Sequence, residues 1–444
     1  MTTATLAILV LVVSFVILLV LNVPVAFCIG ISSLLSLLVA GNIPAFLMIA
    51  QKMATGIDSF ALLAIPFFIL AGLFMGRGGI ARRLIDFANV LVGRFRGGLA
   101  FVNIVTCMLF GSISGSAAAA VSSVGSFMIP LMNKMGYHRD FNAATSITAA
   151  TTGLLIPPSN VMIVYSLACG GIVSIPAIFM AGVIPGILVG LGLMIVAGLI
   201  SAKHNYGKGE RFTFGEFVLR FLKAIPALLL VVIVLGGIIG GIFTATEAAA
   251  IAVVYAFFLS VVIYREVKLM DLPGIVLQCA VSTAVVMVLI ATSMAMSWVL
   301  AMANVPQNIS EFLLGLTDSS VIIFLIINLM LLAVGTFMDM TPAVLIFTPI
   351  FLPVVQQAGA ALGLSEGEAA LHFGIIMIMN LCIGLCTPPV GTVLFLGCGI
   401  ANTTVTKIMR HLVPFFISMV TVLFVCTYLP VISLTLPKLL HFLE

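Results

Sequence analysis

Two pairs of adjacent prolines interrupt long apolar stretches of this sequence, and they limit the possible folds more than any other feature. The first pair, at 157–158, lies within the apolar run 141–170, and the second, at 388–389, lies within the run 373–401. Proline lacks a backbone N–H, its ring collides with the preceding helical turn, and it pushes the residue before it out of the α-helical region. Unwound backbone at membrane depth is tolerated only where protein buries it or where it lines a wet cavity. We therefore predict two broken helices at matching places of a transport site.

Composition places both runs in a membrane. The chain has 444 residues, of which 63% are hydrophobic and 7% are charged. A bilayer span needs about 20 apolar residues, and the chain offers roughly ten or more such stretches. The longest polar interval, 201–223, is too short to fold as a soluble domain. We expect an all-α polytopic membrane protein with the lipid bilayer as its partner.

The N-terminal run and the cysteines agree with this class. Residues 1–21 lack the positive start and the small-residue cleavage site of a signal peptide, so we interpret them as a retained first span. All eight cysteines lie within apolar runs without CxxC spacing, which predicts small buried side chains rather than disulfides or a metal site. The five histidines lie at loop or span ends, and we assign them no role.

The distribution of Lys and Arg predicts the topology. If the N-terminus lies outside, 16 of the 18 basic residues fall on the cytoplasmic side, and only Lys52 and Lys438 lie outside. The net charge of +4 is then a property of cytoplasmic loops, and we expect no nucleic-acid partner. Both termini are predicted to be periplasmic. The path predicts spans at 6–23, 26–40, 61–75, 175–200, 227–243, 248–264, 275–303 and 413–436, an interfacial segment at 44–60, an amphipathic cytoplasmic helix at 212–223 and an outside turn at 304–312.

Two segments do not fit as simple spans. Segment 100–132 is followed and preceded by basic residues, so both of its ends should be cytoplasmic and it should form a re-entrant hairpin. Segment 321–355 is followed by a loop that holds two glutamates and no Lys or Arg, which predicts a hairpin entered from outside. Making either hairpin a simple span would invert every later loop.

Each hairpin is followed by one of the broken helices, so the chain contains an internal repeat. Gly111 aligns with Gly335 at an offset of 224 residues, and Pro157 aligns with Pro388 at an offset of 231. Because the two hairpins open to opposite sides, the repeats are inverted, as in many secondary transporters. The predicted division is 1–97 for N-terminal scaffold helices, 98–200 for the first transport repeat, 201–303 for the cytoplasmic arm helix and further scaffold helices, and 304–444 for the second repeat and the final span.

Several motifs resemble a known family in order along the whole chain. They are GSISGSAAAA, MIPLMNKMGY, GLLIPPSN, GGIFTATEAAA, FMDMTP and TPPVGT. The chain resembles the large membrane subunit of tripartite ATP-independent periplasmic (TRAP) transporters, the DctM-like family. The resemblance implies a Na⁺-coupled importer of organic acids with an elevator-type fold in the bacterial inner membrane. It also implies two partners, a small four-helix membrane subunit (DctQ-like) and a periplasmic substrate-binding protein (DctP-like).

Small polar residues at the hairpin tips and the unwound segments are the candidate ligands. Hydroxyl and carbonyl oxygens suit Na⁺, the expected coupling ion, although a run of small residues is also typical of close helix packing. The predicted sodium-binding residues are Gly111, Ser112, Ser114, Gly115, Ser116, Gly153, Pro157 and Asn160 in the first repeat, and Gly335, Thr336, Met338, Thr387, Pro388 and Thr392 in the second. The predicted substrate-binding residues are Ser114, Ser116, Ser159, Asn160, Asp339, Thr341, Pro389 and Gly391.

Asp339 is the acidic residue placed deep in a hairpin tip. An ionisable group within a membrane is a functional hypothesis by default. The alternative is that its carboxylate caps the half-helix beginning at Thr341. Both interpretations place it at the site.

Other classes of function fit less well. In GSISG, Ile113 occupies the place of the serine of a GxSxG motif, and neither a histidine within a span nor an HExxH motif is present, so we expect no enzyme. No organic cofactor or transition metal is expected. A stand-alone Na⁺/anion symporter is the main alternative, and a passive channel fits the hairpins poorly. Sialic acid or a keto-sugar acid is the suggested substrate.

Overall fold

The computed structural model describes residues 3–21, 23–41, 44–207, 213–317 and 319–443. These residues form helices and connecting turns, without a strand. The helices are α1 (Thr3–Val20), α2 (Val25–Ala40), α3 (Ala45–Gly56), α4 (Ala64–Arg77), α5 (Ile80–Val92), α6 (Gly98–Ser114), α7 (Ala117–Ala120), α8 (Ser126–Lys134), α9 (Arg139–Thr152), α10 (Asn160–Ala168), α11 (Ile175–Lys203), α12 (Phe214–Ile239), α13 (Ala245–Phe257), α14 (Leu272–Met302), α15 (Val305–Leu316), α16 (Ser320–Phe337), α17 (Met340–Ala360), α18 (Glu366–Gly384), α19 (Thr392–Ala401), α20 (Val405–Tyr428) and α21 (Val431–Leu439).

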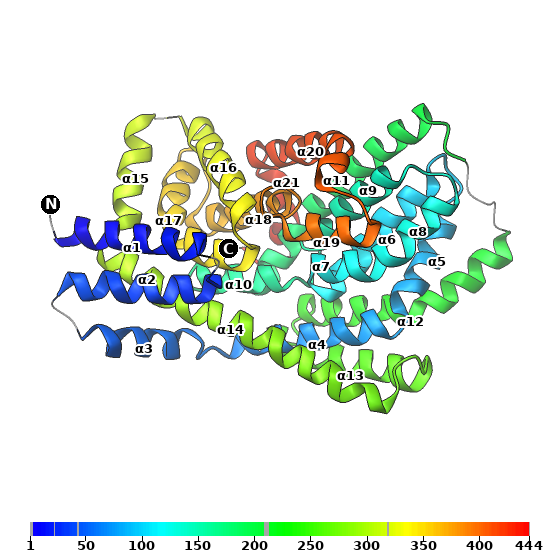
Figure 1. Ribbon diagram of the computed structural model, residues 1–444, viewed down its shortest axis with the longest axis horizontal. Helices are drawn as coiled ribbons and strands as arrows, with labels where there is room; N and C mark the ends of the chain where they lie inside the picture. Colours follow the sequence, from blue (N-terminus) through cyan, green and yellow to red (C-terminus); the bar gives the residue numbers. More distant parts are fainter. Residues whose placement is uncertain (1–2, 22, 42–43, 208–212, 318, 444) are drawn as a thin grey trace.

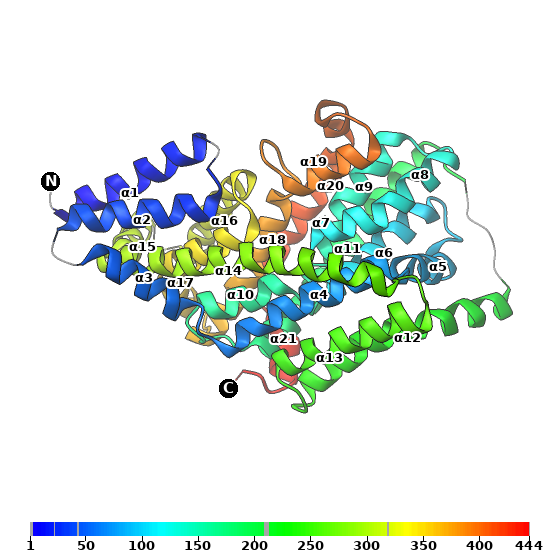
Figure 2. The same ribbon diagram turned by 60° about the horizontal axis from the view of Figure 1, so that its bottom comes forward.

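The helices form an elongated molecule in which α6–α11 and α15–α21 occupy the centre. Figure 1 shows α3, α14, α4, α13 and α12 along its lower side, and Figure 2 shows the long α14 running across this side beside α4. Helix α4 packs against α13, α14 and α6, so it connects the outer helices with the first hairpin.

Nine helices of the described chain are long and apolar enough to cross a membrane. Shorter apolar helices include α1, α2, α6 and α19. This pattern confirms a polytopic all-α membrane protein, in which most predicted spans correspond to one helix each.

Pairs of charged and polar residues agree with the topology predicted from charge. Arg83 contacts Glu266 at 3.1 Å, and both lie in segments assigned to the cytoplasmic side. Lys438 pairs with Glu368, and both lie in segments assigned to the outside. Each pair joins segments that are far apart in the sequence but assigned to one side, as a consistent threading requires.

The outside turn predicted at 304–312 is wrong, because these residues begin the helix α15. Pro306 is tolerated there because the first turn of a helix has N–H groups without partners in any case. Pro306, Ser310 and Leu313 are buried at helical spacing, and α15 packs against α17.

The single final span predicted at 413–436 is also wrong. Helix α20 ends at Tyr428, and α21 begins at Val431. Leu429, with φ −120° and ψ 79°, precedes Pro430, and a residue before proline is disfavoured in the α-helical region.

The amphipathic segment predicted at 212–223 is not a separate helix. It forms the first turns of α12, which continues through Pro226 to Ile239. The backbone N–H of Thr213 donates to the Glu216 carboxylate at 2.9 Å and starts the helix. Lys208, Arg211 and Phe212, which belong to the predicted cytoplasmic segment, lie outside the described residues.

Candidate functional site

Both predicted broken helices and both hairpin tips are present as interruptions between helices. The first broken helix unwinds at 153–159, between α9 and α10, and the second at 385–391, between α18 and α19. The bonds Pro157–Pro158 and Pro388–Pro389 are both cis. The first tip lies at Gly115 and Ser116, between α6 and α7, and the second at Met338 and Asp339, between α16 and α17.

In each repeat, the hairpin crosses the broken helix at a pair of glycines. A Cβ added at Gly111 would lie 2.8 Å from the Cα of Gly153. A Cβ added at Gly384 would lie 2.5 Å from the carbonyl carbon of Gly335. The two backbones therefore touch, and only glycine leaves room for this contact. Because the two pairs are equivalent by the predicted repeat, the crossing is a shared feature of both halves.

The two broken helices run antiparallel to each other. At one end, the Arg139 side chain donates to the carbonyl of Ala401, which connects the start of α9 with the end of α19. At the other end, the Tyr165 hydroxyl donates to the carbonyl of Ala370, which connects α10 with the start of α18. This arrangement agrees with the inverted repeats predicted from charge.

The first crossing has oxygen atoms without hydrogen-bond partners. Oγ of Ser159 and Oδ1 of Asn160 are both buried and unpaired. Within the described chain, the carbonyls of residues 153–158 accept no hydrogen bond. The C-terminal ends of α6 and α9, which carry partial negative charge, also lie at this crossing. The arrangement offers several oxygens to a hard cation and no fixed positive charge.

The remaining predicted residues of the first site surround the same crossing. Gly115 has φ +61°, and a Cβ there would lie 2.9 Å from Nδ2 of Asn160. Oγ of Ser116 accepts from the N–H of Ala119 at 3.2 Å, and Ser114 donates to the Ser116 carbonyl at 3.4 Å. The hairpin tip and the unwound segment are therefore in direct contact, as predicted.

The second crossing is more fully hydrogen-bonded. The N–H of Val390 donates to the Thr336 carbonyl at 3.1 Å, which connects the second unwound segment with its hairpin. The N–H of Gly391 donates to the Thr387 carbonyl at 3.1 Å, and the Thr387 hydroxyl donates to Ile383 at 2.7 Å. Fewer oxygens remain available here than at the first crossing.

Asp339 stands at the N-cap position of α17, but its side chain makes no capping hydrogen bond. The helix begins at Met340, one residue before the predicted start at Thr341. The carboxylate is exposed on the surface of the chain. The alternative that Asp339 acts as a side-chain cap is therefore wrong, and its carboxylate is available to other groups.

Comparison with known proteins identifies the family. The model of the family described as "Tripartite ATP-independent periplasmic transporter, DctM component" matches residues 12–432. The chain belongs to the DctM family of TRAP transporter components.

Relatives with this organisation extend over nearly the whole chain. The uncharacterized protein YgiK of Salmonella typhimurium is 50% identical over 429 residues, which is 96% of each chain. The C4-dicarboxylate TRAP transporter large permease protein DctM of Rhodobacter capsulatus is 36% identical over 94% of this chain and 96% of its own. The isethionate TRAP transporter permease protein DctMQ of Oleidesulfovibrio alaskensis is 40% identical over 95% of this chain and 65% of its own.

A solved transporter has the same fold. The structure of the Alcanivorax borkumensis YdaH transporter, which its title describes as having an unusual topology, aligns with a TM-score of 0.63 over 88% of this chain and 89% of its own. The sequence identity is 12%. The likeness therefore supports the DctM-family chain's fold and not its substrate.

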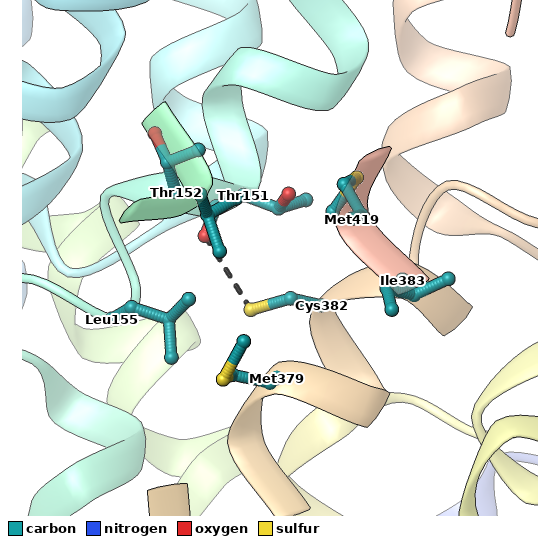
Figure 3. Close-up of a pocket in the computed structure, with 8 residues that line it drawn as sticks. Thr151, Thr152, Leu155, Met379, Cys382, Ile383 and Met419 are labelled. Carbon is teal, nitrogen blue, oxygen red and sulfur yellow. Dashed lines mark hydrogen bonds between the residues drawn. The ribbon is translucent and has the colours of Figure 1, made fainter. Parts of the chain in front are cut away.

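A small cavity separates the two broken helices of this DctM-family protein. It leaves about 10 Å³ for the centre of a water molecule. Figure 3 shows Thr151, Thr152 and Leu155 from the first broken helix facing Met379, Cys382 and Ile383 from the second. The Cys382 thiol donates to the Thr151 carbonyl at 3.4 Å. The cavity is too small for an organic acid, and none of its lining residues belongs to the predicted set.

The predicted substrate residues form two groups rather than one. Within the described chain, no hydrogen bond joins Ser159 or Asn160 of the first repeat to Asp339 or Gly391 of the second. The broken helices contact each other through Thr151 and Cys382 instead.

Sequence reasoning missed buried amide pairs that fix each hairpin to its broken helix. Nδ2 of Asn103 on α6 donates to Oγ of Ser146 on α9 at 2.6 Å. Nδ2 of Asn380 on α18 donates to Oδ1 of Asn328 on α16, also at 2.6 Å. An asparagine within an apolar run is the pattern that would have found them. Gly384 was also missed, although it begins the motif that was singled out.

Proposed function

We propose that this DctM-family protein is the large permease of a Na⁺-coupled transporter that imports an organic acid across the bacterial inner membrane. The observation that carries the proposal is the first glycine crossing, where buried oxygens of Ser159 and Asn160 have no partner. In secondary transporters, unwound carbonyls and the C-terminal ends of half-helices coordinate Na⁺ near the repeat interface. The same elements meet at this crossing, so we assign the coupling ion to it.

The organic acid is proposed to bind near the N-terminal ends of half-helices that follow the breaks. Helix N-termini carry partial positive charge and attract carboxylates or sulfonates. The relatives described as C4-dicarboxylate and isethionate transporters are consistent with an acidic substrate. Sialic acid and keto-sugar acids stay as candidates to be tested beside these two.

A substrate-binding protein and a small membrane subunit are the proposed partners. The family description refers to a tripartite periplasmic transporter. The DctMQ relative is longer than this chain, which covers 65% of it. We propose that a DctQ-like subunit joins this chain as a separate polypeptide and that a DctP-like protein delivers the substrate. Movement of the two repeats as one elevator against the outer helices is part of the same proposal.

The decisive experiment is uptake of labelled organic acids into proteoliposomes that contain this chain and a small subunit. The Na⁺ gradient and the binding protein are varied independently. Uptake that requires both supports the tripartite symporter. Uptake driven by Na⁺ without a binding protein supports the alternative of a stand-alone symporter, and uptake without Na⁺ contradicts the assignment of the coupling ion.

Replacing Ser159 with alanine should weaken Na⁺ dependence. The change removes one oxygen ligand while the proline-broken backbone stays in place, so we expect the Na⁺ concentration for half-maximal uptake to rise at least about threefold, equivalent to about 0.6 kcal/mol. Ser126→Ala is the control, because that hydroxyl donates to the nearby Ser123 carbonyl in an exposed turn. An equal change in both variants would remove Ser159 from the cation site.

A further inference from the structure

Two histidines and an aspartate gather at the end of α9 opposite to Gly153. His138 directly precedes α9, Asp140 lies in its first turn, and His411 lies on α20. Each side chain offers one ligand atom, and these three atoms lie within 4.8 Å of one another. The cluster therefore connects the start of the first broken helix with a helix that follows the second one.

The side chains are oriented toward one another. The rings of His138 and His411 are stacked with centroids 4.9 Å apart, and Nδ1 of His138 lies 3.9 Å from Oδ2 of Asp140. Nδ1 of His411 is buried and has no hydrogen-bond partner. An unpaired buried nitrogen beside a second imidazole and a carboxylate is a feature that a metal ion would satisfy.

Neighbouring contacts hold the aspartate in place. Oδ1 of Asp140 accepts a hydrogen bond from the Thr403 hydroxyl at 2.6 Å, which leaves Oδ2 directed toward His138. The adjacent Arg139 donates to the carbonyl of Ala401. Hydrogen bonds of this kind orient the ligands in metal sites, and they also fix the α19–α20 connection against α9.

The donor set selects the kind of ion. Imidazole nitrogen with one carboxylate is typical of Zn²⁺, whereas Ca²⁺ and Mg²⁺ prefer oxygen alone. Arg139, Lys407 and Arg410 lie near in sequence to the cluster and disfavour a cation held by charge alone. An ion bound by direct nitrogen bonds overcomes this repulsion better than a hydrated one does.

We propose that His138, Asp140 and His411 bind Zn²⁺, with a fourth position open to water. Ligand atoms around tetrahedral Zn²⁺ lie about 3.3 Å apart, so the cluster contracts by about 1.5 Å on binding. The side chain of His138 is 57% exposed and free to turn toward the ion. The bound ion fastens α9 to α20. This assignment departs from the expectation, based on cysteine spacing and the missing HExxH motif, that the chain holds no transition metal.

The test is calorimetric titration of Zn²⁺ into the purified, chelator-treated full chain in detergent. We expect one ion per chain, and a dissociation constant at least about tenfold higher for His411→Ala and for Asp140→Asn. His204→Ala is the control, because this histidine lies at the end of α11, with Nδ1 3.0 Å from the Ile200 carbonyl, outside the cluster. Equal weakening in His204→Ala, or unchanged binding in His411→Ala, would overturn the proposal.

Thermal unfolding separates binding from damage to the fold. Zn²⁺ should raise the unfolding temperature of the unmodified chain and leave that of His411→Ala unchanged, with similar values for both in chelator. If His411→Ala does not fold, His138→Ala at the exposed position takes its place. Stabilisation by Zn²⁺ that persists in His138→Ala contradicts the site. Neither measurement depends on transport.

Discussion

At the residue scale, the glycines at the two crossings have a role that no other residue can fill. Gly384 faces the backbone of Gly335, whereas Gly367 on the same helix has open space around the position of a Cβ. The two positions differ in their neighbours rather than in their helix. Substitution therefore distinguishes close backbone contact from ordinary helix propensity.

Gly384→Ala should lower the free energy of unfolding by about 1–3 kcal/mol, because the added methyl group enters a space filled by backbone. Gly367→Ala should leave it unchanged or raise it by up to about 1 kcal/mol, because alanine favours the helix. Denaturant unfolding in detergent measures both. Similar stability of the two variants would contradict the crossing.

At the element scale, buried amides connect each hairpin to its broken helix. Asn328 and Asn380 are fully buried, and Asn328 also donates to the Phe324 carbonyl at 2.9 Å. Oδ1 of Asn380 has no partner. Within an apolar bundle, such a network fixes the position of one helix along the other more strongly than apolar packing does.

The pair Asn328 and Asn380 should show coupling in a double-mutant cycle. Alanine at either position leaves the partner amide without its bond, so the double variant should lose less than the two single variants combined, with a coupling free energy of about 0.6–1.7 kcal/mol. Asn308→Ala, on an exposed face of α15, serves as the reference change. Additive losses for Asn328 and Asn380 would show that the pair contributes nothing as a pair.

At the scale of the whole molecule, each repeat is completed by the other. Helix α10, which follows the first break, packs against α17 and α18, and α19, which follows the second, packs against α8 and α9. Ile147 of α9 fills the space beside Gly397 of α19. Because of this exchange, neither repeat buries its own half-helix, and the two are expected to fold and move as one body.

Cysteine labelling tests the inverted topology. All eight native cysteines are buried, so an impermeant maleimide should leave the folded chain unmodified in intact cells. Lys134→Cys, after the first hairpin, should react only from the cytoplasm, and Leu362→Cys, after the second, only from the periplasm; both positions are exposed. Permeabilised cells, in which both must react, provide the control. Reaction of both from one side would contradict the inversion, and exchanged sides would reverse the orientation assigned from charge.

Local chemistry explains what the sequence could predict by itself. The proline pairs break their helices in any surroundings because each proline acts on its own backbone and on the preceding residue. The positions of both unwound segments and both tips followed from this rule and from the charges that flank the hairpins. The capping box of Thr244 and Glu247 is equally local, and the Thr244 N–H donates to Glu247 at 2.8 Å.

Tertiary structure decided the features that depend on a distant partner. His372, predicted at a span end without a role, is buried and bonded to Ser433 and Thr427 because α21 folds back onto α18. The partner of Gly335, the unpaired oxygens of Ser159 and Asn160, and the meeting of His138 with His411 likewise required the packed chain. An oxygen or nitrogen is left unpaired only by what the rest of the fold fails to bring to it, and no local pattern records that.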